Sequence, residues 1–311
     1  MRNGTLPLII LAGGDRTPTQ LPESGADKHP LSGLKGIDIR LGDRSLVDLL
    51  LERLHEIGRF GPIYIAGPVA VYGESRQGAR VIDTDGGFGD NIRTSLTAVM
   101  QDHPEGAVGL ITCDVLPDRQ ELERQLDDFE AHRPLAFWFA MILAPESTEA
   151  LGTSSWKPQY RVVQDATGEA VQILPGHLII VEPSRWRLDI AYRTFALAFN
   201  TRNRPVTYRL WFIVRHILVF LLRKDLGRLL RLQPPTLTCV TLYHAIRIGT
   251  KLRQGTISAS EMADRFVRIF VKAKDQRESR GRIVVMEAMT MAKDIDTFEE
   301  AEEMSRKLGL G

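Results

Sequence analysis

The sequence predicts a three-layer α/β fold with a mostly parallel sheet and a helical elaboration in the C-terminal half. Short apolar runs that alternate with helical segments recur through the first half of the chain, as in domains built from βα units. The first run, residues 8–11, breaks at Gly13 and Gly14 into a polar loop, and an amphipathic helix starts near Ser45. The chain has 311 residues, of which 43% are hydrophobic and 25% charged, so it can bury a sizeable core as one large domain or two small ones.

The other elements follow from runs of the same kind. A helix is expected to run to Met100 from Asp90 or Asn91, either of which can cap it. A capping box of Thr297 and Glu300 predicts the last helix. Strands are expected at residues 62–68, 79–83, 107–112, 135–145, 178–183, 238–242 and 283–285, a hairpin at 161–174, and further helices at 186–198, 208–232 and 260–270.

Charge and cysteine content exclude several classes of protein. The net charge of +1 and the lack of long runs of like charge argue against a nucleic-acid partner. With two cysteines, Cys113 and Cys239, the chain can build neither a disulfide framework nor a cysteine-based zinc site, and a reducing, cytoplasmic setting is expected. The apolar run before Gly13 is too short for the core of a signal peptide.

Two adjacent glycines after the first strand mark a candidate ligand-binding loop. Without a Cβ, Gly13 and Gly14 let the backbone approach a ligand closely, and the peptide N–H groups of such a loop suit a base edge or a phosphate. The loop has neither the P-loop pattern nor the glycine pattern of dinucleotide-binding folds. Lys35 follows the loop and precedes the helix that starts near Ser45.

One aspartate occupies a second favourable position. Asp114 follows the strand at 107–112, and ligands of open α/β sheets bind outside the carboxyl ends of the strands. A carboxylate there can hold Mg²⁺, which takes its remaining ligands from phosphate and water. The neighbouring Cys113 is expected to pack in the core rather than act as a nucleophile. His177 is expected to be a packed or capped histidine rather than a catalytic base.

The glycine loop, Lys35, Asp114 and Asp296 stand in the order found in nucleotidyltransferases of the glycosyltransferase-A type. The chain resembles this family, which includes molybdenum-cofactor guanylyltransferase-like and sugar-phosphate nucleotidyltransferase-like enzymes. The resemblance covers residues 6–116 and 294–308 well and residues 161–183 loosely. The departures from the family pattern are Leu34 in place of a proline, Pro117 one position late, and Phe298 in place of another proline.

The resemblance implies roles for the candidate residues. It implies a nucleotide-diphospho-sugar transferase-like fold, Mg²⁺ held by Asp114 and Asp296, and catalysis by these two aspartates together with Lys35, which offsets phosphate charge. Lys157 and Arg161 are candidates for binding the phosphate of the acceptor. The residues implied for nucleotide binding are Leu11, Ala12, Gly13, Gly14, Lys35, Gly89 and Asn91.

The reaction implied is Mg²⁺-dependent transfer of NMP from an NTP, with CTP or GTP favoured, to a small phosphorylated acceptor with release of pyrophosphate. Such chemistry is mainly positioning and charge neutralisation. Two alternatives share the fold: a glycosyltransferase that uses a nucleotide sugar, and a non-catalytic nucleotide-binding or scaffold protein. The glycosyltransferase would need an Asp-x-Asp near the metal, whereas Cys113-Asp114-Val115 supplies one carboxylate.

The organisation expected is a nucleotidyltransferase core at residues 1–199, a helical elaboration at 200–282 and a return to the core at 283–311. Within the elaboration, residues 210–222 are apolar all round but contain Arg215 and His216, and they fall short of the ~20 apolar residues of a transmembrane helix. Such a helix needs a cover of protein or lipid. We expect it to pack against its own domain or a second copy in a homodimer. Peripheral contact of residues 208–232 with the inner membrane surface is the alternative.

Overall fold

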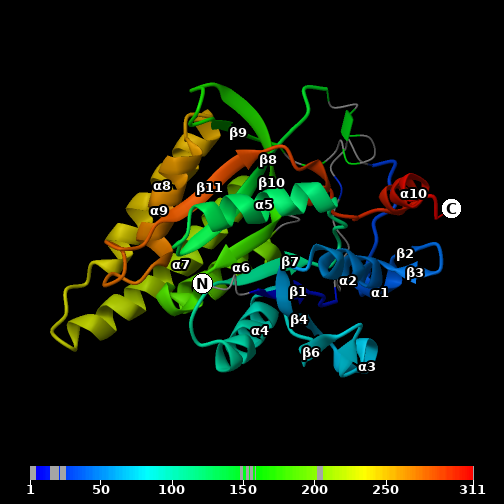
Figure 1. Cartoon of the computed structure of the whole chain (residues 1–311). Coiled ribbons are helices and arrows are strands. Elements are labelled where there is room, and N and C mark those ends of the chain that lie inside the picture. The colour runs from blue at the N-terminus through cyan, green and yellow to red at the C-terminus, as the bar shows by residue number, and fades with distance from the viewer. Residues whose placement is uncertain are drawn as a thin grey trace.

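The computed structural model describes residues 5–14, 21, 26–147, 150–151, 154, 157, 159–201 and 206–310. In the helix that begins at Val206, the side chains of residues 206, 207, 209 and 210 lie outside this description. Helices cover both faces of a mostly parallel sheet (Figure 1), so the predicted fold class is confirmed.

The central sheet is mixed but mainly parallel. Its strands are β1 (Leu6–Leu11), β4 (Phe60–Gly67), β5 (Ser75–Arg76), β6 (Ala79–Asp83), β7 (Val108–Thr112), β8 (Phe137–Leu143), β9 (Tyr160–Val163), β10 (Ala170–Val181) and β11 (Gly281–Met286). Their order is β11-β8-β10-β7-β1-β4-β6-β5, with β9 paired to β10. β10 is antiparallel to β7, β8 and β9, and β5 to β6, whereas all other pairs are parallel. A short antiparallel ribbon joins β2 (Arg40–Leu41) and β3 (Arg44–Ser45).

The helices follow the strands as predicted in the first half and cluster in the second. They are α1 (Lys35–Asp38), α2 (Leu46–Ile57), α3 (Val69–Tyr72), α4 (Phe88–Asp102), α5 (Arg119–Ala131), α6 (Leu188–Asn200), α7 (Val206–Leu229), α8 (Leu237–Gln254), α9 (Ala259–Phe270) and α10 (Phe298–Lys307). Short 3₁₀ turns occur at η3 (Pro183–Arg185) and η4 (Met289–Met291). α7, α8 and α9 gather at the side of the sheet away from α10 (Figure 1).

Alternating side chains of β1 separate two apolar cores. Leu8 and Ile10 point to one face, which α2 and α5 cover, and Ile9 points to the other, which α4, α6 and α9 cover. This alternation follows from the two-residue period of a strand. Because both faces of β1 are buried, its carboxyl end and that of the adjacent β7 are held rigidly at one edge of the core.

The strand expected at residues 238–242 is wrong, since this segment lies within α8. The buried residues of α8 are Leu237, Thr238 and Thr241, and their spacing is that of one helix face rather than the alternation of a strand. Threonine and valine favour strands only weakly, and packing of one helix face outweighs that preference.

The expected caps of α4 are also wrong. The helix begins at Phe88 after Gly87, with no capping side chain, and Asp90 lies in its first turn. The Asn91 side chain accepts hydrogen bonds from the Gly86 N–H at 3.0 Å and from the Thr84 hydroxyl. Asn91 therefore fixes the loop before the helix, and its amide lies below the glycine loop of β1.

The described part of the chain covers one side of α7 and leaves the other exposed. Ile217 and Leu221 are buried in the apolar core that contains Ile9. On the opposite side of the helix, Trp211, Leu222 and Leu226 are exposed. Its own domain therefore covers the inner face of this helix, and cover of the outer face by a second copy of the chain stays a prediction. No helix among the described residues is long and apolar enough to cross a membrane.

Candidate active site

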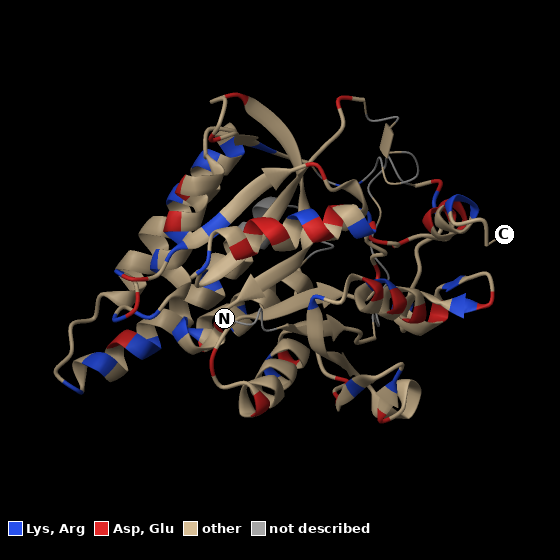
Figure 2. Ribbon diagram, viewed as in Figure 1, with Lys and Arg blue, Asp and Glu red and all other residues tan. Residues whose placement is uncertain are grey.

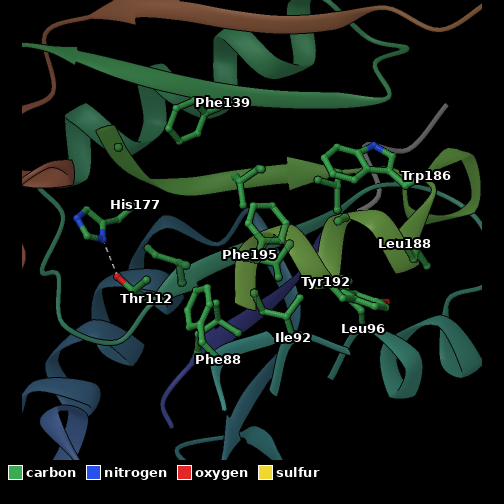
Figure 3. A pocket seen from close by; sticks show the side chains of 17 residues that line it. Phe88, Ile92, Leu96, Thr112, Phe139, His177, Trp186, Leu188, Tyr192 and Phe195 are labelled. Atoms are coloured by element: carbon green, nitrogen blue, oxygen red, sulfur yellow. Dashed lines mark hydrogen bonds between the residues drawn. The ribbon is translucent and has the colours of Figure 1, made fainter. Parts of the chain in front are cut away.

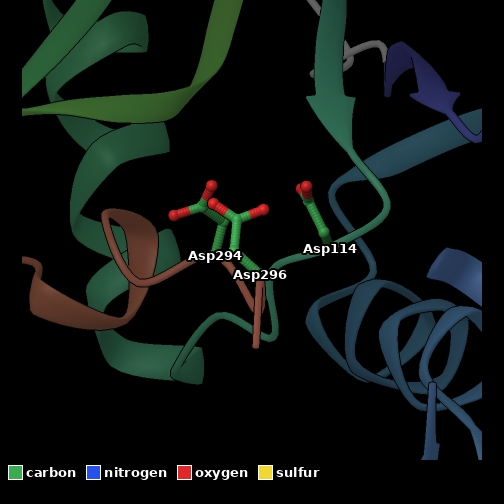
Figure 4. Close-up of side chains that lie close together, drawn as sticks. All are labelled: Asp114, Asp294 and Asp296. Atoms are coloured by element: carbon green, nitrogen blue, oxygen red, sulfur yellow. The ribbon is translucent and has the colours of Figure 1, made fainter. Parts of the chain in front are cut away.

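Three carboxylates converge at the carboxyl end of β7 (Figure 4). Asp114 follows this strand, and Asp294 and Asp296 precede α10. One ligand oxygen from each lies within 4.8 Å of the others. The Ile295 N–H donates a hydrogen bond to the Asp114 carbonyl at 2.8 Å. This bond holds the turn after β7 against the segment that precedes α10. The structure thus brings together Asp114 and Asp296, which are distant in sequence.

Asp294 is the member of this cluster that sequence analysis missed. A signal for it was available, because residues two apart in an extended segment point to the same side. The intervening Ile295 is buried in the core, so Asp294 and Asp296 lie on the same side of this segment, with Asp296 the nearer to Asp114 in Figure 4. The cluster therefore contains an Asp-x-Asp, in the last loop rather than after β7. The single carboxylate after β7 no longer argues against the glycosyltransferase, and the product released has to separate the two reactions.

Lys35 places a buried ammonium beside this cluster. It begins α1, and its Nζ donates a hydrogen bond to Asp296 and lies 3.9 Å from an Asp114 oxygen. Burial disfavours the charged amine, but Asp114 and Asp296 outweigh burial and raise the pKa of Lys35. The amine is therefore a cation at neutral pH.

Lys157, which is expected at the phosphate of the acceptor, is buried inside the protein. Its amine donates to the Asp294 carboxylate at 2.5 Å and lies 3.3 Å from Glu300. Burial opposes its charge, but Asp294 and Glu300 raise the pKa of Lys157. Arg161 is not drawn into the cluster: it lies on β9, and its stem lies where a side chain at Gly255 would be.

The pKa values of Asp294 and Asp296 are shifted in opposite directions. Burial raises the pKa of Asp296, and the neighbouring Asp294 raises it further. Burial acts in the same direction on Asp294, but Lys157 and then His177 outweigh it and lower the pKa of Asp294. A cation between these groups would relieve their repulsion.

The predicted capping box is present and fixes the backbone that carries Asp296. Glu300 accepts from the Asp296 N–H at 2.7 Å and the Thr297 N–H at 3.1 Å, and Thr297 accepts in turn from the Glu300 N–H. Ser154 also donates to Glu300, at 2.7 Å. Because Glu300 binds both the loop and Lys157, the helix start and the carboxylate cluster form one network.

The cluster fits a divalent cation. Oxygen ligands from carboxylates are those that Mg²⁺ takes from proteins. The Asp114 Oδ1 atom is buried and has no hydrogen-bond partner among the described residues, which is unusual for a carboxylate oxygen. Asp114, Asp294 and Asp296 are therefore the residues that could hold the metal.

The glycine loop lies next to this cluster. The Cys113 N–H donates to the Leu11 carbonyl at 3.1 Å, so the loop after β1 and the turn with Asp114 lie side by side. A Cβ at Gly13 would lie 2.3 Å from the Asn91 amide nitrogen. The loop and Asn91 thus form one surface, on which a ligand can contact the backbone directly.

The remaining predicted nucleotide residues divide between the loop and the core. Ala12 is buried, and Leu11 is the last residue of β1. Gly89 lies where α4 packs closely against α6. A Cβ added at this position would be 2.9 Å from the Tyr192 carbonyl oxygen. Burial raises the pKa of Cys113 to about 12, which agrees with packing rather than nucleophilic chemistry.

His177 is closer to the site than expected. Its Nδ1 is 2.8 Å from the Thr112 hydroxyl, and its Nε2 is 3.7 Å from an Asp294 oxygen. The residue sits on β10, which runs antiparallel beside β7. It therefore links the sheet to the carboxylate cluster.

We expect Lys157→Met to lower the free energy of unfolding by ~3 kcal/mol, because it leaves Asp294 and Glu300 without their buried counter-charge. Thermal unfolding followed by circular dichroism measures the change. Lys251→Met is the matched control, since it removes a partly exposed ion pair with Glu261 that contributes about 0–1 kcal/mol. Equal stability losses in the two variants would contradict a compensating role for Lys157.

Comparison with known proteins shows that the fold of this chain is similar to that of several solved structures. No protein-family model matches the sequence, and no curated protein matches it. A solved structure named a hypothetical transferase, from Thermus thermophilus, is 17% identical, with a TM-score of 0.57 over 96% of this chain and 100% of that chain. The chain also matches a 4-diphosphocytidyl-2C-methyl-D-erythritol synthase from Anaerococcus prevotii, with 9% identity, a TM-score of 0.45 and 99% coverage of each chain.

A third match is HddC from Yersinia pseudotuberculosis, solved in complex with GMP-PN. It is 13% identical, with a TM-score of 0.40 over 60% of this chain and 78% of that chain. At these identities the similarity is one of fold. The shared fold is the mixed α/β architecture with a mostly parallel sheet that the sequence predicts.

Proposed function

We propose that the protein is a Mg²⁺-dependent nucleotidyltransferase that moves NMP from an NTP to a phosphorylated acceptor and releases pyrophosphate. The observation that carries this proposal is the convergence of Asp114, Asp294 and Asp296 with the Lys35 ammonium beside a glycine loop. Carboxylates, a buried cation and open backbone are what binding and reaction of a triphosphate require.

In the reaction, an oxygen of the acceptor phosphate attacks the α-phosphorus of the NTP. The bond from this phosphorus to the bridging oxygen breaks, and pyrophosphate leaves with the electron pair. A bound Mg²⁺ would supply charge neutralisation at these oxygens. The three aspartates would hold it, and the capping network of Glu300 keeps Asp296 in place.

Lys35 would act on the charge that the phosphates bring. Its ammonium lies against Asp296 and near Asp114. Beside a bound nucleotide, the same ammonium would offset charge at the α-phosphate and the leaving pyrophosphate. The glycine loop would present its N–H groups to the nucleotide.

The test is pyrophosphate release with each NTP, Mg²⁺ and a panel of phosphorylated acceptors. Release that requires both substrates and stops with EDTA is the expected result. Release of a nucleoside diphosphate from a nucleotide sugar, without pyrophosphate from any NTP, would support the glycosyltransferase instead. Nucleotide binding with neither product would support the scaffold protein.

We expect Gly13→Ala to weaken NTP binding about tenfold, because the new methyl group would displace the Asn91 amide from beneath the loop, a loss of ~1.4 kcal/mol. Titration calorimetry with the non-hydrolysed NTP measures the affinity. Gly249→Ala is the control, since a Cβ there meets no atom within 4 Å. Unchanged affinity in Gly13→Ala would place the nucleotide elsewhere.

A further inference from the structure

The outer face of α7 is apolar and exposed. Its exposed apolar side chains recur at intervals of three and four residues, apart from one interval of five between Val214 and Val219, so most of them line one side of the helix. Trp211 is 57% exposed and Leu226 60% exposed, and the turn after the helix ends in Leu232, which is 97% exposed. The full set is Tyr208, Trp211, Val214, Val219, Leu222, Leu226 and Leu229, followed by Leu230 and Leu232.

α8 returns from this turn with exposed apolar residues of its own, Val240, Tyr243 and Ile246. We refer to residues 206–254, which comprise α7, the turn and α8, as the α7–α8 hairpin. Exposed apolar surface on this scale marks a site of interaction.

The α7–α8 hairpin is also strongly basic (Figure 2). Its one acidic residue, Asp225, is buried and accepts hydrogen bonds from the N–H groups of Leu237 and Thr238 at the start of α8. The whole chain has a net charge of +1, so the rest of it is acidic. The basic residues of the hairpin are Arg209, Arg215, Arg223, Lys224, Arg228, Arg231, Arg247, Lys251 and Arg253.

Several of these arginines are available to a partner. Arg215, Arg223, Arg231, Arg247 and Arg253 are exposed, and none of them forms an ion pair with another described residue. The guanidinium of Arg215 lies 5.2 Å from the centre of the Trp211 ring, which places a cation directly beside the largest exposed apolar side chain. Guanidinium groups of this kind bind phosphate oxygens in a fork.

We propose that the α7–α8 hairpin binds the surface of an anionic phospholipid bilayer, with its apolar side chains in the interface and its arginines on the headgroup phosphates. An exposed apolar helix face flanked by arginines is the composition of interfacial helices. A second copy of the chain fits this face less well, because a two-fold interface would set one basic surface against another. The partner of opposite charge is therefore the membrane.

Sedimentation with vesicles tests this proposal without any reference to enzymatic activity. We expect the wild-type chain to pellet with vesicles of phosphatidylcholine and phosphatidylserine, and the bound fraction to fall at least tenfold in pure phosphatidylcholine or at about 1 M salt. The emission of Trp211 should shift to the blue on binding. The other described tryptophans, Trp138 and Trp186, are already buried, so Trp211→Phe should lose this shift.

Two double variants test the exposed face, one at its apolar side chains and one at its arginines. Trp211→Glu with Leu222→Glu should abolish sedimentation, and Arg215→Glu with Arg223→Glu should do so through charge alone. Val71→Glu is the control, because Val71 is an exposed apolar residue on α3, outside the hairpin. All these sites are exposed, and unchanged thermal unfolding confirms that the variants fold.

A wild-type chain that stays in the supernatant would overturn the proposal. So would a dimer, measured by light scattering, that Trp211→Glu with Leu222→Glu converts to a monomer, because the second copy would then be the occupant.

A cavity beside the carboxylate cluster carries a second inference, about the acceptor. The cavity has a volume of about 200 Å³ and lies between α4, α6 and the sheet (Figure 3). Its walls are formed mainly by apolar side chains, among them Phe88, Ile92, Leu188 and Phe195. An apolar cavity of ~150 Å³ stays dry and binds benzene, so this one can take a larger apolar group.

One end of the cavity reaches the proposed active site. Thr112 and His177 line that end (Figure 3), and the Nε2 atom of His177 is 3.7 Å from an Asp294 oxygen. The opposite end is at Trp186 and Leu188 (Figure 3). A ligand with its polar group at the carboxylates can therefore extend an apolar part along the cavity.

We infer that the acceptor carries its phosphate on an apolar chain that occupies this cavity; the inference rests on the proposed function. Dodecyl phosphate is the probe, with glycerol 3-phosphate as the polar counterpart. Pyrophosphate release should be at least tenfold faster with dodecyl phosphate. Dodecyl phosphate should also displace the apolar dye N-phenylnaphthylamine from the protein, which measures the cavity without turnover.

Variants that fill the cavity distinguish the two proposals. Ala191→Phe and, in case it disturbs folding, Leu188→Trp should abolish dye binding and raise the KM for dodecyl phosphate at least tenfold, whereas Val71→Phe should change neither. Dye displacement without pyrophosphate release would support the cavity and refute the nucleotidyltransferase. The inference about the acceptor alone would be overturned by a different result. In that case pyrophosphate release with glycerol 3-phosphate would equal or exceed that with dodecyl phosphate, and the variants would not change it.

Discussion

Replacing Asp114 or Asp296 by asparagine is expected to lower turnover by about a hundredfold or more, because a metal clamp contributes several kcal/mol to the transition state. The substitution keeps the shape of each side chain and removes its charge. Asp294→Asn should act in the same direction, since its carboxylate belongs to the same cluster. Initial rates of pyrophosphate release at saturating NTP measure the loss.

Metal binding gives an independent reading of the same variants. Mn²⁺ binding followed by electron paramagnetic resonance should weaken in Asp114→Asn and Asp296→Asn and stay unchanged in Asp127→Asn. Asp127 is the matched control, because it is an exposed carboxylate paired with Arg59 on the surface. If Asp114→Asn and Asp296→Asn keep wild-type rates and wild-type Mn²⁺ affinity, the cluster is a structural feature and another site holds the metal.

The parts of this site that the sequence predicts are those that depend on position in a sheet. An apolar run followed by Asp114 indicates a carboxylate at the carboxyl end of a strand, and two glycines after another run indicate an open loop. The adjacency of the two follows once β1 and β7 pair in parallel. The link to Asp296 depends on the family resemblance, since no local pattern relates residues so far apart in sequence.

The parts that could not be predicted depend on which charges fold inward. Lys157 looks like a surface lysine in sequence, because exposed lysines are the norm, yet it is buried against Asp294 and Glu300. The segment 238–242 looks like a strand until the buried side of α8 is known. The outer face of α7 shows the same limit, since an apolar helix does not reveal which partner covers it.

Lys35→Met is expected to lower turnover on the order of a hundredfold, while the KM for the acceptor changes little, because a charge aimed at reacting phosphates acts mostly in the transition state. Lys307→Met is the control, since Lys307 pairs with Glu303 on the exposed face of α10. Unchanged turnover would mean that another cation serves the phosphates. Lys28, which pairs with Asp27 at the surface, would be one candidate, and Arg16, outside the described residues, another.

The same variant has a second expected effect that does not depend on turnover. Without a metal, Lys35 is the cation nearest to Asp296, so Lys35→Met should lower the thermal stability of the metal-free protein. Mg²⁺ can then replace the missing charge, because a ligand that binds only the folded state stabilises it by mass action. Addition of Mg²⁺ should therefore raise the Tm of Lys35→Met more than that of the wild type. Equal increases in the two proteins would mean that Lys35 and the metal do not share the carboxylates.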